Sequence, residues 1–382
     1  MSLTKQAKPS KNILMVGYGL LILVFWLLLE FASYVIEKNY FPGVFFDKSL
    51  ITQPYDQYLK VRNAKLGWLP RATDGYGARV DTSEFSETKP CVDVYGDSFT
   101  WGGEVEDNFA WPTLLSSELQ CRVRNYGVSG YGSDQAFLRF LETENSSRIV
   151  VINHLSENII RNVNQFRNFI YPGSEYVFKP RFVADGGVLK LVDMPVIGNK
   201  DLKVFLSNPG LFLHNEYFLP EGGAGVQKLQ FSYALNLMHA FKHWHVKAKL
   251  KNESRHAQFY DADHPSNGLM VTENVLRGFY DAAKSRRLTP IVTVMPTCLD
   301  FQDYERTGRF PYKNLTDNLE ANGIPVLDLG KEIWNEVGTR YKNLYITCSG
   351  HFNELGNQFV AKKFGDYLVG KKLLKVSGGD LK

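Results

Sequence analysis

A serine and a distant histidine are the residues of this chain best suited to covalent chemistry. Ser98 stands in residues 96–99 (GDSF), directly after an apolar run, and His351 stands in residues 350–357 (GHFNELGN). A serine hydroxyl is a weak nucleophile until a neighbouring base takes its proton. The pair therefore predicts attack by Ser98 on an ester carbonyl, with His351 acting first as base and then as acid.

A glycine-rich segment at residues 125–132 (NYGVSGYG) supports this interpretation. It follows a second apolar run, and its glycines allow a backbone N–H to approach a developing oxyanion. The alternative is an ordinary tight turn. Ser129 within the segment does not match the Gly-x-Ser-x-Gly turn of another hydrolase class, so Ser98 is the expected nucleophile.

Short apolar runs alternate with amphipathic stretches through most of the chain, which predicts a parallel sheet covered by helices on both faces. Strands are expected at residues 91–95, 122–126, 148–153, 290–295 and 325–329, and helices at 109–119, 133–144, 269–284, 313–322 and 355–368. Sites on such sheets form outside the carboxyl ends of the strands. All the chemical candidates are expected at that edge.

Residues from about 163 to 266 interrupt the pattern and are interpreted as an inserted subdomain beside the site. A hairpin is expected from residues 178–183 and 188–192 around the turn 185–187 (DGG), and a basic amphipathic helix at 231–250. That helix would place His239 and His243 on one face, near His245. A metal site needs further ligands, so we expect no metal and a solvated or membrane-facing helix.

The N-terminus predicts a membrane anchor. Residues 1–11 contain Lys5, Lys8 and Lys11, and the following run is free of charge from Ile13 to Leu29. A span of this length and polarity predicts a transmembrane helix over residues 12–36 with a cytoplasmic N-terminus. The alternative is a cleaved signal peptide. The main domain is then extracytoplasmic, or periplasmic in a bacterium, with a lead-in at 37–85 and the catalytic domain at 86–382.

The four cysteines are compatible with an oxidising, extracytoplasmic compartment. We expect Cys91 to pair with Cys121 and Cys298 with Cys348, because each pair lies at neighbouring strand ends or loops. The alternative is four free buried thiols. The net charge is only +4 and no basic block is present, so no nucleic-acid partner is expected.

Three of these segments resemble sequence blocks of the SGNH/GDSL hydrolase superfamily: residues 96–99, 125–130 and 350–353. The resemblance implies a flavodoxin-like three-layer α/β/α fold with a five-stranded parallel sheet. It also implies Ser98 as nucleophile, His351 as base, and the N–H groups of Ser98 and Gly130 as oxyanion donors. Anchored members of this kind are associated with O-acetyl groups of envelope polysaccharides. No metal or organic cofactor is implied.

The chain departs from the family pattern in two places. The family's third block supplies an asparagine as an oxyanion donor. Here Asn158 is the best candidate, while Asn153 and Glu157 remain alternatives. The family's aspartate three residues before the histidine is replaced by Cys348. Either Ser98 and His351 work as a dyad, or another acid such as Asp328 orients the imidazole.

The sequence therefore predicts an anchored ester hydrolase or O-acyl transferase that acts on envelope or exported carbohydrate. The expected partners are the membrane, an acylated carbohydrate, and a membrane-bound acyl donor or assembly partner. The alternative is a non-catalytic subunit of an envelope assembly that keeps this fold.

Overall fold

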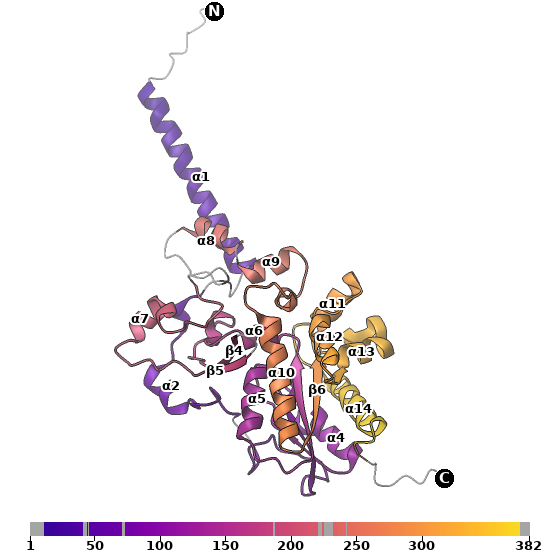
Figure 1. Cartoon of the computed structure of the whole chain (residues 1–382). Coiled ribbons are helices and arrows are strands. Elements are labelled where there is room, and N and C mark those ends of the chain that lie inside the picture. The colour runs from indigo at the N-terminus through magenta and orange to yellow at the C-terminus, as the bar shows by residue number, and fades with distance from the viewer. Residues whose placement is uncertain are drawn as a thin grey trace, which may run out of the picture.

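The centre of the molecule is a five-stranded parallel sheet (Figure 1). The computed structural model describes residues 11–40, 44, 46–70, 73–185, 188–220, 224, 232–241 and 243–374. The strands are β1 (Pro90–Tyr95), β2 (Arg122–Asn125), β3 (Ile149–Leu155), β6 (Thr289–Met295) and β7 (Val326–Asp328). Their spatial order is β2-β1-β3-β6-β7. Counted along the chain this order is 2-1-3-4-5, the flavodoxin-like order, so the predicted fold class is confirmed.

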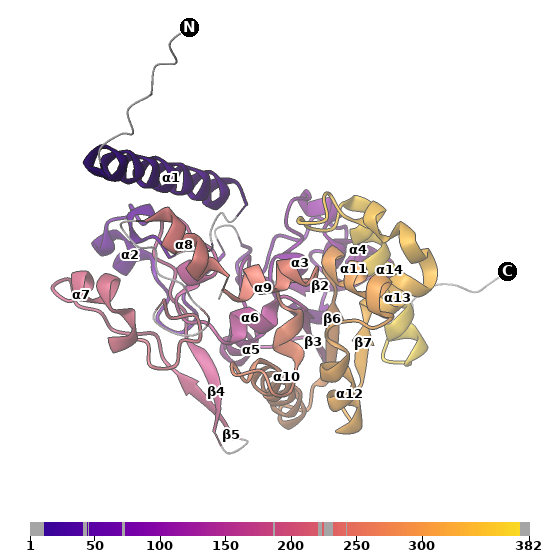
Figure 2. The ribbon, with the colours of Figure 1, turned by 90° about the horizontal axis from the view of Figure 1, so that it is seen from above.

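Helices cover both faces of the sheet, which explains why its strands read as short apolar runs. One face carries α5 (Ser133–Glu142), α10 (Gly268–Ser285) and α12 (Lys313–Ala321), and the other carries α4 (Trp111–Leu119), α13 (Leu329–Val337) and α14 (Glu354–Gly370). The two helix layers are separate in Figure 2. Aromatic contacts join each layer internally: Phe140 of α5 meets Phe279 of α10 at 4.7 Å, and Trp111 of α4 stacks on Phe364 of α14 at 4.5 Å.

Parallel strands end at the same edge, and three short or medium helices begin there. They are α3 (Ser98–Trp101) after β1, α6 (Asn158–Asn162) after β3, and α11 (Cys298–Thr307) after β6. The sequence pattern did not indicate α11 or α13. The expected strand at 325–329 is shorter because Asp328 accepts a hydrogen bond from the Lys331 N–H (3.1 Å) and caps α13.

The inserted region lies between α6 and α10. Its elements are 3₁₀ turns at Arg167–Phe169, Pro209–Leu211 and Ala257–Tyr260, strands β4 (Arg181–Asp185) and β5 (Val188–Val192), and helices α7 (Leu202–Ser207), α8 (Tyr233–Ala240) and α9 (Trp244–Leu250). The expected hairpin is present as the antiparallel pair β4–β5, while Gly186 and Gly187 of its turn lie outside the described residues.

The expected single helix at 231–250 is wrong, because the segment forms α8 and α9 with a break between them. His243 Nδ1 accepts a hydrogen bond from the His245 N–H (3.2 Å) and caps α9. Because α9 begins after His243, His239 and His243 belong to different helices and do not share the helix face expected for them. Phe231 and Lys242 lie outside the described residues.

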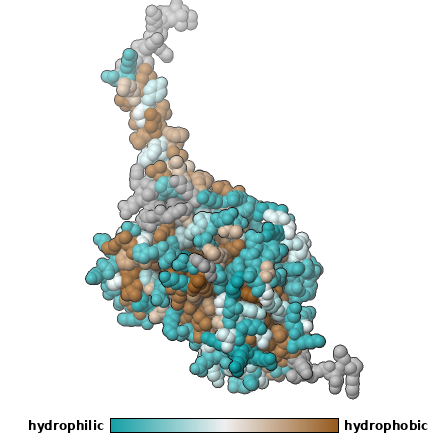
Figure 3. All heavy atoms as spheres, viewed as in Figure 1, coloured by the Kyte–Doolittle hydropathy of each residue, from teal (hydrophilic) through white to brown (hydrophobic). Residues whose placement is uncertain are grey.

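The N-terminal helix α1 (Lys11–Tyr40) projects from the body, and its side chains are largely exposed and apolar (Figure 3). Within the described residues it is the one helix that is long and apolar enough to cross a membrane, with a mean hydropathy of 2.3 in its most apolar window. Lys5 and Lys8 lie outside the described residues. The lead-in that follows contains a 3₁₀ turn at Lys48–Leu50 and helix α2 (Tyr55–Val61).

Both expected disulfides are present. Cys91 is bonded to Cys121 beside the starts of β1 and β2, where Pro90 pairs with Arg122. Cys298, the first residue of α11, is bonded to Cys348 in the loop before α14. The pairs are consistent with an oxidising compartment.

Candidate active site

Ser98 lies on a tight turn between β1 and α3. Asp97 caps α3 by accepting a hydrogen bond from the Phe99 N–H (2.9 Å). Glycine is required at position 96, because a Cβ there would come within 2.0 Å of Thr100 Oγ1. The Ser98 residue is 8% exposed, at the carboxyl edge of the sheet.

The glycine-rich segment packs directly against this turn. Asn125 Nδ2 donates to the Thr100 carbonyl (2.9 Å) and to the Trp101 carbonyl (3.1 Å), which holds the two segments together. A Cβ on Gly127 would lie 2.4 Å from the Trp101 nitrogen, so only glycine permits the close approach. Gly130 has φ +83°, a conformation that favours glycine.

Asn158, the first residue of α6, faces the same region. Its Oδ1 accepts a hydrogen bond from Arg161 Nη1 (2.9 Å), and the same Nη1 lies 3.1 Å from Asp97 Oδ2. Arg161 therefore connects Asn158 to the residue next to Ser98 and fixes the direction of the amide. Asn158 Nδ2 is buried and has no hydrogen-bond partner within the described part of the chain. An oriented, unused donor of this kind is what an oxyanion site needs.

The two alternatives to Asn158 have other surroundings. Asn153 lies in β3, and its Cβ packs 3.2 Å from the position a Cβ would take on Gly96. Burial alone would raise the pKa of Glu157, but Arg255 and Arg161, at 2.5 and 3.5 Å, lower it to about 2. An ionised Glu157 would repel an oxyanion. Asn153 Nδ2 is also buried without a partner in the described residues, but its Oδ1 has none either, whereas Asn158 Oδ1 is held by Arg161, so the geometry favours Asn158.

His351 lies over the turn that carries Ser98. Its ring is 4.9 Å from the ring of Phe99, and its Nε2 is 3.2 Å from the position a Cβ would take on Gly103. The Gly103 N–H in turn donates to the Ser98 carbonyl (2.8 Å). The structure thus brings His351 against the turn that carries Ser98, 253 positions away in sequence. No hydrogen bond joins the two side chains within the described residues.

The carboxylate beside His351 belongs to Glu104. Glu104 Oε2 lies 3.0 Å from His351 Nδ1 and accepts a hydrogen bond from the His351 N–H (3.2 Å). These contacts lower the pKa of Glu104. Glu104 has φ +67°, a conformation that costs energy for a residue other than glycine and that recurs at functional sites. The Glu104 carboxylate lies beside Nδ1 at ion-pair distance but without the geometry of a hydrogen bond to it. This leaves Nε2 as the nitrogen that can take a proton from a nucleophile.

Asp328, the acid proposed from the sequence, serves another purpose. It accepts hydrogen bonds from the Tyr312 hydroxyl (3.0 Å) and the Lys331 N–H (3.1 Å). Burial raises its pKa. Its Oδ1 accepts both bonds, one from the residue that precedes α12 and one from the first turn of α13. Sequence reasoning missed Glu104, since an acidic residue in a loop gives no signal of its own. Its one clue is that it follows Gly102 and Gly103 closely after Ser98.

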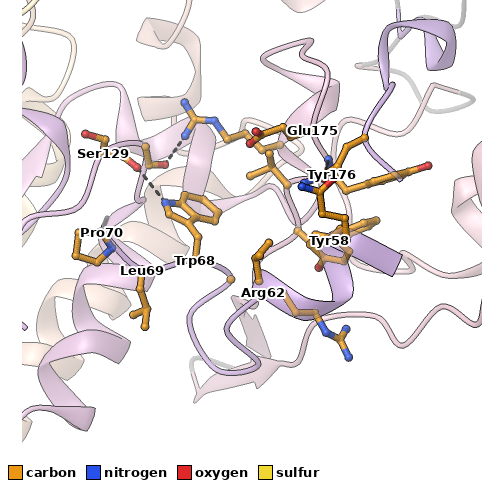
Figure 4. A pocket seen from close by; sticks show the side chains of 16 residues that line it. Tyr58, Arg62, Trp68, Leu69, Pro70, Ser129, Glu175 and Tyr176 are labelled. Carbon is orange, nitrogen blue, oxygen red and sulfur yellow. Dashed lines mark hydrogen bonds between the residues drawn. The ribbon is translucent and has the colours of Figure 1, made fainter. Parts of the chain in front are cut away.

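A pocket of about 670 Å³ opens beside the glycine-rich segment (Figure 4). It is built by the lead-in and the inserted region, and its side chains combine aromatic rings with amides and charges. Trp68 Nε1 donates to the Ser129 carbonyl (3.0 Å), and Arg167 donates to the Gly130 carbonyl (2.5 Å). The lining residues are Gln53, Gln57, Tyr58, Val61, Arg62, Gly67, Trp68, Leu69, Pro70, Ser129, Gly130, Arg167, Glu175, Tyr176, Val177 and Phe178.

The described residues contain no group of three or more His, Cys, Asp or Glu side chains placed to hold a metal ion. His243 is buried, and burial with the nearby charge of His245 lowers its pKa to about 3.

Neither a protein-family profile nor a curated protein sequence matches this chain. Among solved structures, it is similar to a member of the lipolytic protein G-D-S-L family from Veillonella parvula (11% identity, TM-score 0.35, covering 72% of this chain and 95% of the other). It is also similar to a GDSL-like lipase from Bacteroides thetaiotaomicron (15%, 0.33, 75% and 89%) and to an acetyl xylan esterase (14%, 0.36, 72% and 98%). Independently of these, the flavodoxin-like order and the meeting of the three sequence blocks at one edge agree with the resemblance to the SGNH/GDSL superfamily.

Proposed function

We propose that this protein is a membrane-anchored, extracytoplasmic serine ester hydrolase or O-acyl transferase that acts on envelope or exported carbohydrate. The observation that carries the proposal is the placement of His351, held by Glu104, over the turn that bears Ser98. A nucleophile, a base and a carboxylate on the far nitrogen of the base form the arrangement that serine acyl chemistry uses.

In the proposed reaction, Ser98 Oγ attacks an ester carbonyl and passes its proton to His351 Nε2. The oxyanion accepts hydrogen bonds from the N–H groups of Ser98 and Gly130 and from Asn158 Nδ2. Each such donor contributes roughly 3–4 kcal/mol to transition-state stabilisation. The alcohol leaves with the proton from His351, and acyl-Ser98 remains. Water resolves this ester in a hydrolase, and a sugar hydroxyl resolves it in a transferase.

The pocket beside Gly130 supports a carbohydrate substrate. Trp68, which is only partly buried, offers an aromatic ring for the apolar side of a sugar, and the buried Tyr58 and Tyr176 form the aromatic wall behind it, while Gln57 and Glu175 offer partners for hydroxyl groups. The apolar helix α1 and the two disulfides support the anchor and the extracytoplasmic location.

A non-catalytic subunit is the competing function. Two observations favour it: Cys348 replaces the family's aspartate, and Ser98 has a low exposure. The two functions differ in whether Ser98 is activated.

A fluorophosphonate reacts with activated serines and separates the two. We expect full-length protein in detergent to gain one adduct on Ser98, located by peptide mass. Ser98→Ala and His351→Ala should both lose it, with the apparent rate falling by about 10⁴-fold. Ser129→Ala is the matched control and should label fully. A folded wild-type protein that gains no adduct would contradict the catalytic proposal and favour the subunit.

A further inference from the structure

The inserted region contacts the N-terminal helix at two separated places. Glu30 Oε1 accepts a hydrogen bond from Ser232 Oγ (2.7 Å), and Glu30 Oε2 accepts one from the Tyr233 N–H (2.6 Å) at the start of α8. The rings of Tyr34 and Tyr233 meet edge to face at 5.0 Å. Further along, Lys249 of α9 donates to the Tyr40 carbonyl (3.2 Å). These contacts fix α8 and α9 relative to α1.

The length of α1 determines how deep in the bilayer these contacts lie. From Lys11 to Glu30 the helix rises about 29 Å, which equals the thickness of a bilayer's hydrocarbon core. Glu30 is then at the outer boundary of the core, and Tyr40 lies about 15 Å beyond it. Helix α8 begins at that boundary.

Helix α8 exposes apolar side chains at this level. Leu235, Met238 and Phe241 are 49%, 65% and 49% exposed. The first two are three residues apart and share a helix face, and Phe241 follows at the helix end. On α9, Leu250 is 66% exposed, between Lys249 and Lys251. Apolar side chains beside lysines are the pattern of a segment that lies in a membrane interface.

We propose that α8 lies in the outer interface of the lipid bilayer, clamped to the anchor by Glu30, so that the catalytic edge of the sheet faces the membrane surface. The proposal rests on the anchoring stated above. The occupant of the apolar face is lipid, because α8 packs along α1 where the apolar run of that helix ends, and because Lys249 and Lys251 flank the exposed Leu250 of the neighbouring α9.

The orientation of the sheet gives this contact a functional meaning. The carboxyl ends of the strands, followed by α6 and α11, lie on the side of the body that bears α8 and α9 (Figure 1). A site placed in this way is suited to an ester carried at the membrane surface.

Depth-dependent quenching tests the contact. Full-length Met238→Cys protein is labelled with an environment-sensitive fluorophore under non-reducing conditions, which preserve both disulfides, and reconstituted into phosphatidylcholine vesicles with nitroxide-labelled lipid. Ser285→Cys is the control, because Ser285 is the last residue of α10, at the end of that helix farther from α8 and α9. We expect several-fold stronger quenching at position 238 than at 285. Equal, weak quenching at both positions would overturn the proposal.

The clamp has its own test. Adding Glu30→Ala to Met238→Cys should reduce the quenching at 238 while alkaline extraction shows that α1 remains inserted. Undiminished quenching would overturn the role of Glu30. Neither measurement needs an active Ser98, so failure of the esterase reaction and failure of the membrane contact are distinguishable.

Discussion

The proposed nucleophile, Ser98, and the proposed base, His351, are held in place by different interactions. Ser98 and Asn158 depend on buried charge, since Asp97 and Arg161 are 1% and 7% exposed and lie 3.1 Å apart. His351 depends on Glu104, whose side chain is 52% exposed, and on the loop anchored by Cys348.

We expect the buried pair beside Ser98 to hold that residue rigidly and the exposed pair at His351 to allow the imidazole to move. A buried, hydrogen-bonded pair is costly to break and insensitive to salt, whereas an exposed pair is screened and contributes little to stability. The nucleophile side is therefore expected to fail with the fold. The base side is expected to respond to single changes that leave the fold intact.

The largest expected effect comes from the disulfides. Closing loops of 30 and 50 residues predicts that removing either pair, as Cys91→Ala/Cys121→Ala or Cys298→Ala/Cys348→Ala, lowers the free energy of unfolding by about 3–4 kcal/mol. Only the second pair adjoins His351, so only its loss should also lower kcat, measured on a chromogenic acetyl ester below the unfolding transition. Equal kcat values in the two double variants would show that the disulfide does not hold the base.

Asn158→Asp tests the nucleophile side. Aspartate keeps an oxygen for Arg161 but removes the buried donor, so kcat should fall about 10²–10³-fold with a small change in KM. Asn322→Asp, at the exposed end of α12, is the control for replacing an amide by a carboxylate away from the site. A fall of less than threefold in Asn158→Asp would assign the third donor to another group.

Acid should lower the stability of the fold through His154 of β3, whose ring contacts the hydroxyl groups of Ser133 and Tyr260. Burial, with the nearby charge of His256, lowers the His154 pKa to about 3, from an ordinary value of 6.5. The folded state therefore resists protonation, and its stability is full above pH 6.5 and falls as the pH drops toward 3, by about 1.4 kcal/mol per unit. Urea unfolding at pH 6.5 and pH 5 should differ by about 2 kcal/mol from this residue. His154→Gln should reduce that difference, and an unchanged difference would exclude His154 as its source.

Glu104→Gln should give the smallest effect, about a tenfold loss of kcat, because glutamine retains a hydrogen-bond acceptor for His351 but not the charge. The loss should be greatest at low salt, where the wild-type pair is least screened. Glu106→Gln, two residues further along the same loop, is the matched control and should leave the pH profile unchanged. Identical pH profiles for wild type and Glu104→Gln would contradict the role of Glu104.

The sequence allowed prediction of those elements that have a local signal, such as an apolar run for a buried strand or a glycine for a turn. Buried strands such as residues 149–155 are apolar throughout, and the glycines around Ser98 mark turns. The orienting acid could not be found in this way, because Asp328 and Glu104 are equally plausible acids until the ends of the strands are placed. The break between α8 and α9 was hidden because His243 fits an amphipathic pattern and also caps a helix.

Hydrogen bonds between segments far apart in the chain have a consequence for biosynthesis. Trp68 donates to Ser129, and the Trp111 N–H donates to Asn357 Oδ1 across 246 positions. Synthesis runs from the N-terminus, so the anchor and the lead-in emerge long before the segment that carries His351. A chain still leaving the ribosome therefore has the segment that carries Ser98 without the segment that carries His351, and the proposed site can form only once Asn357 and the loop before it have emerged.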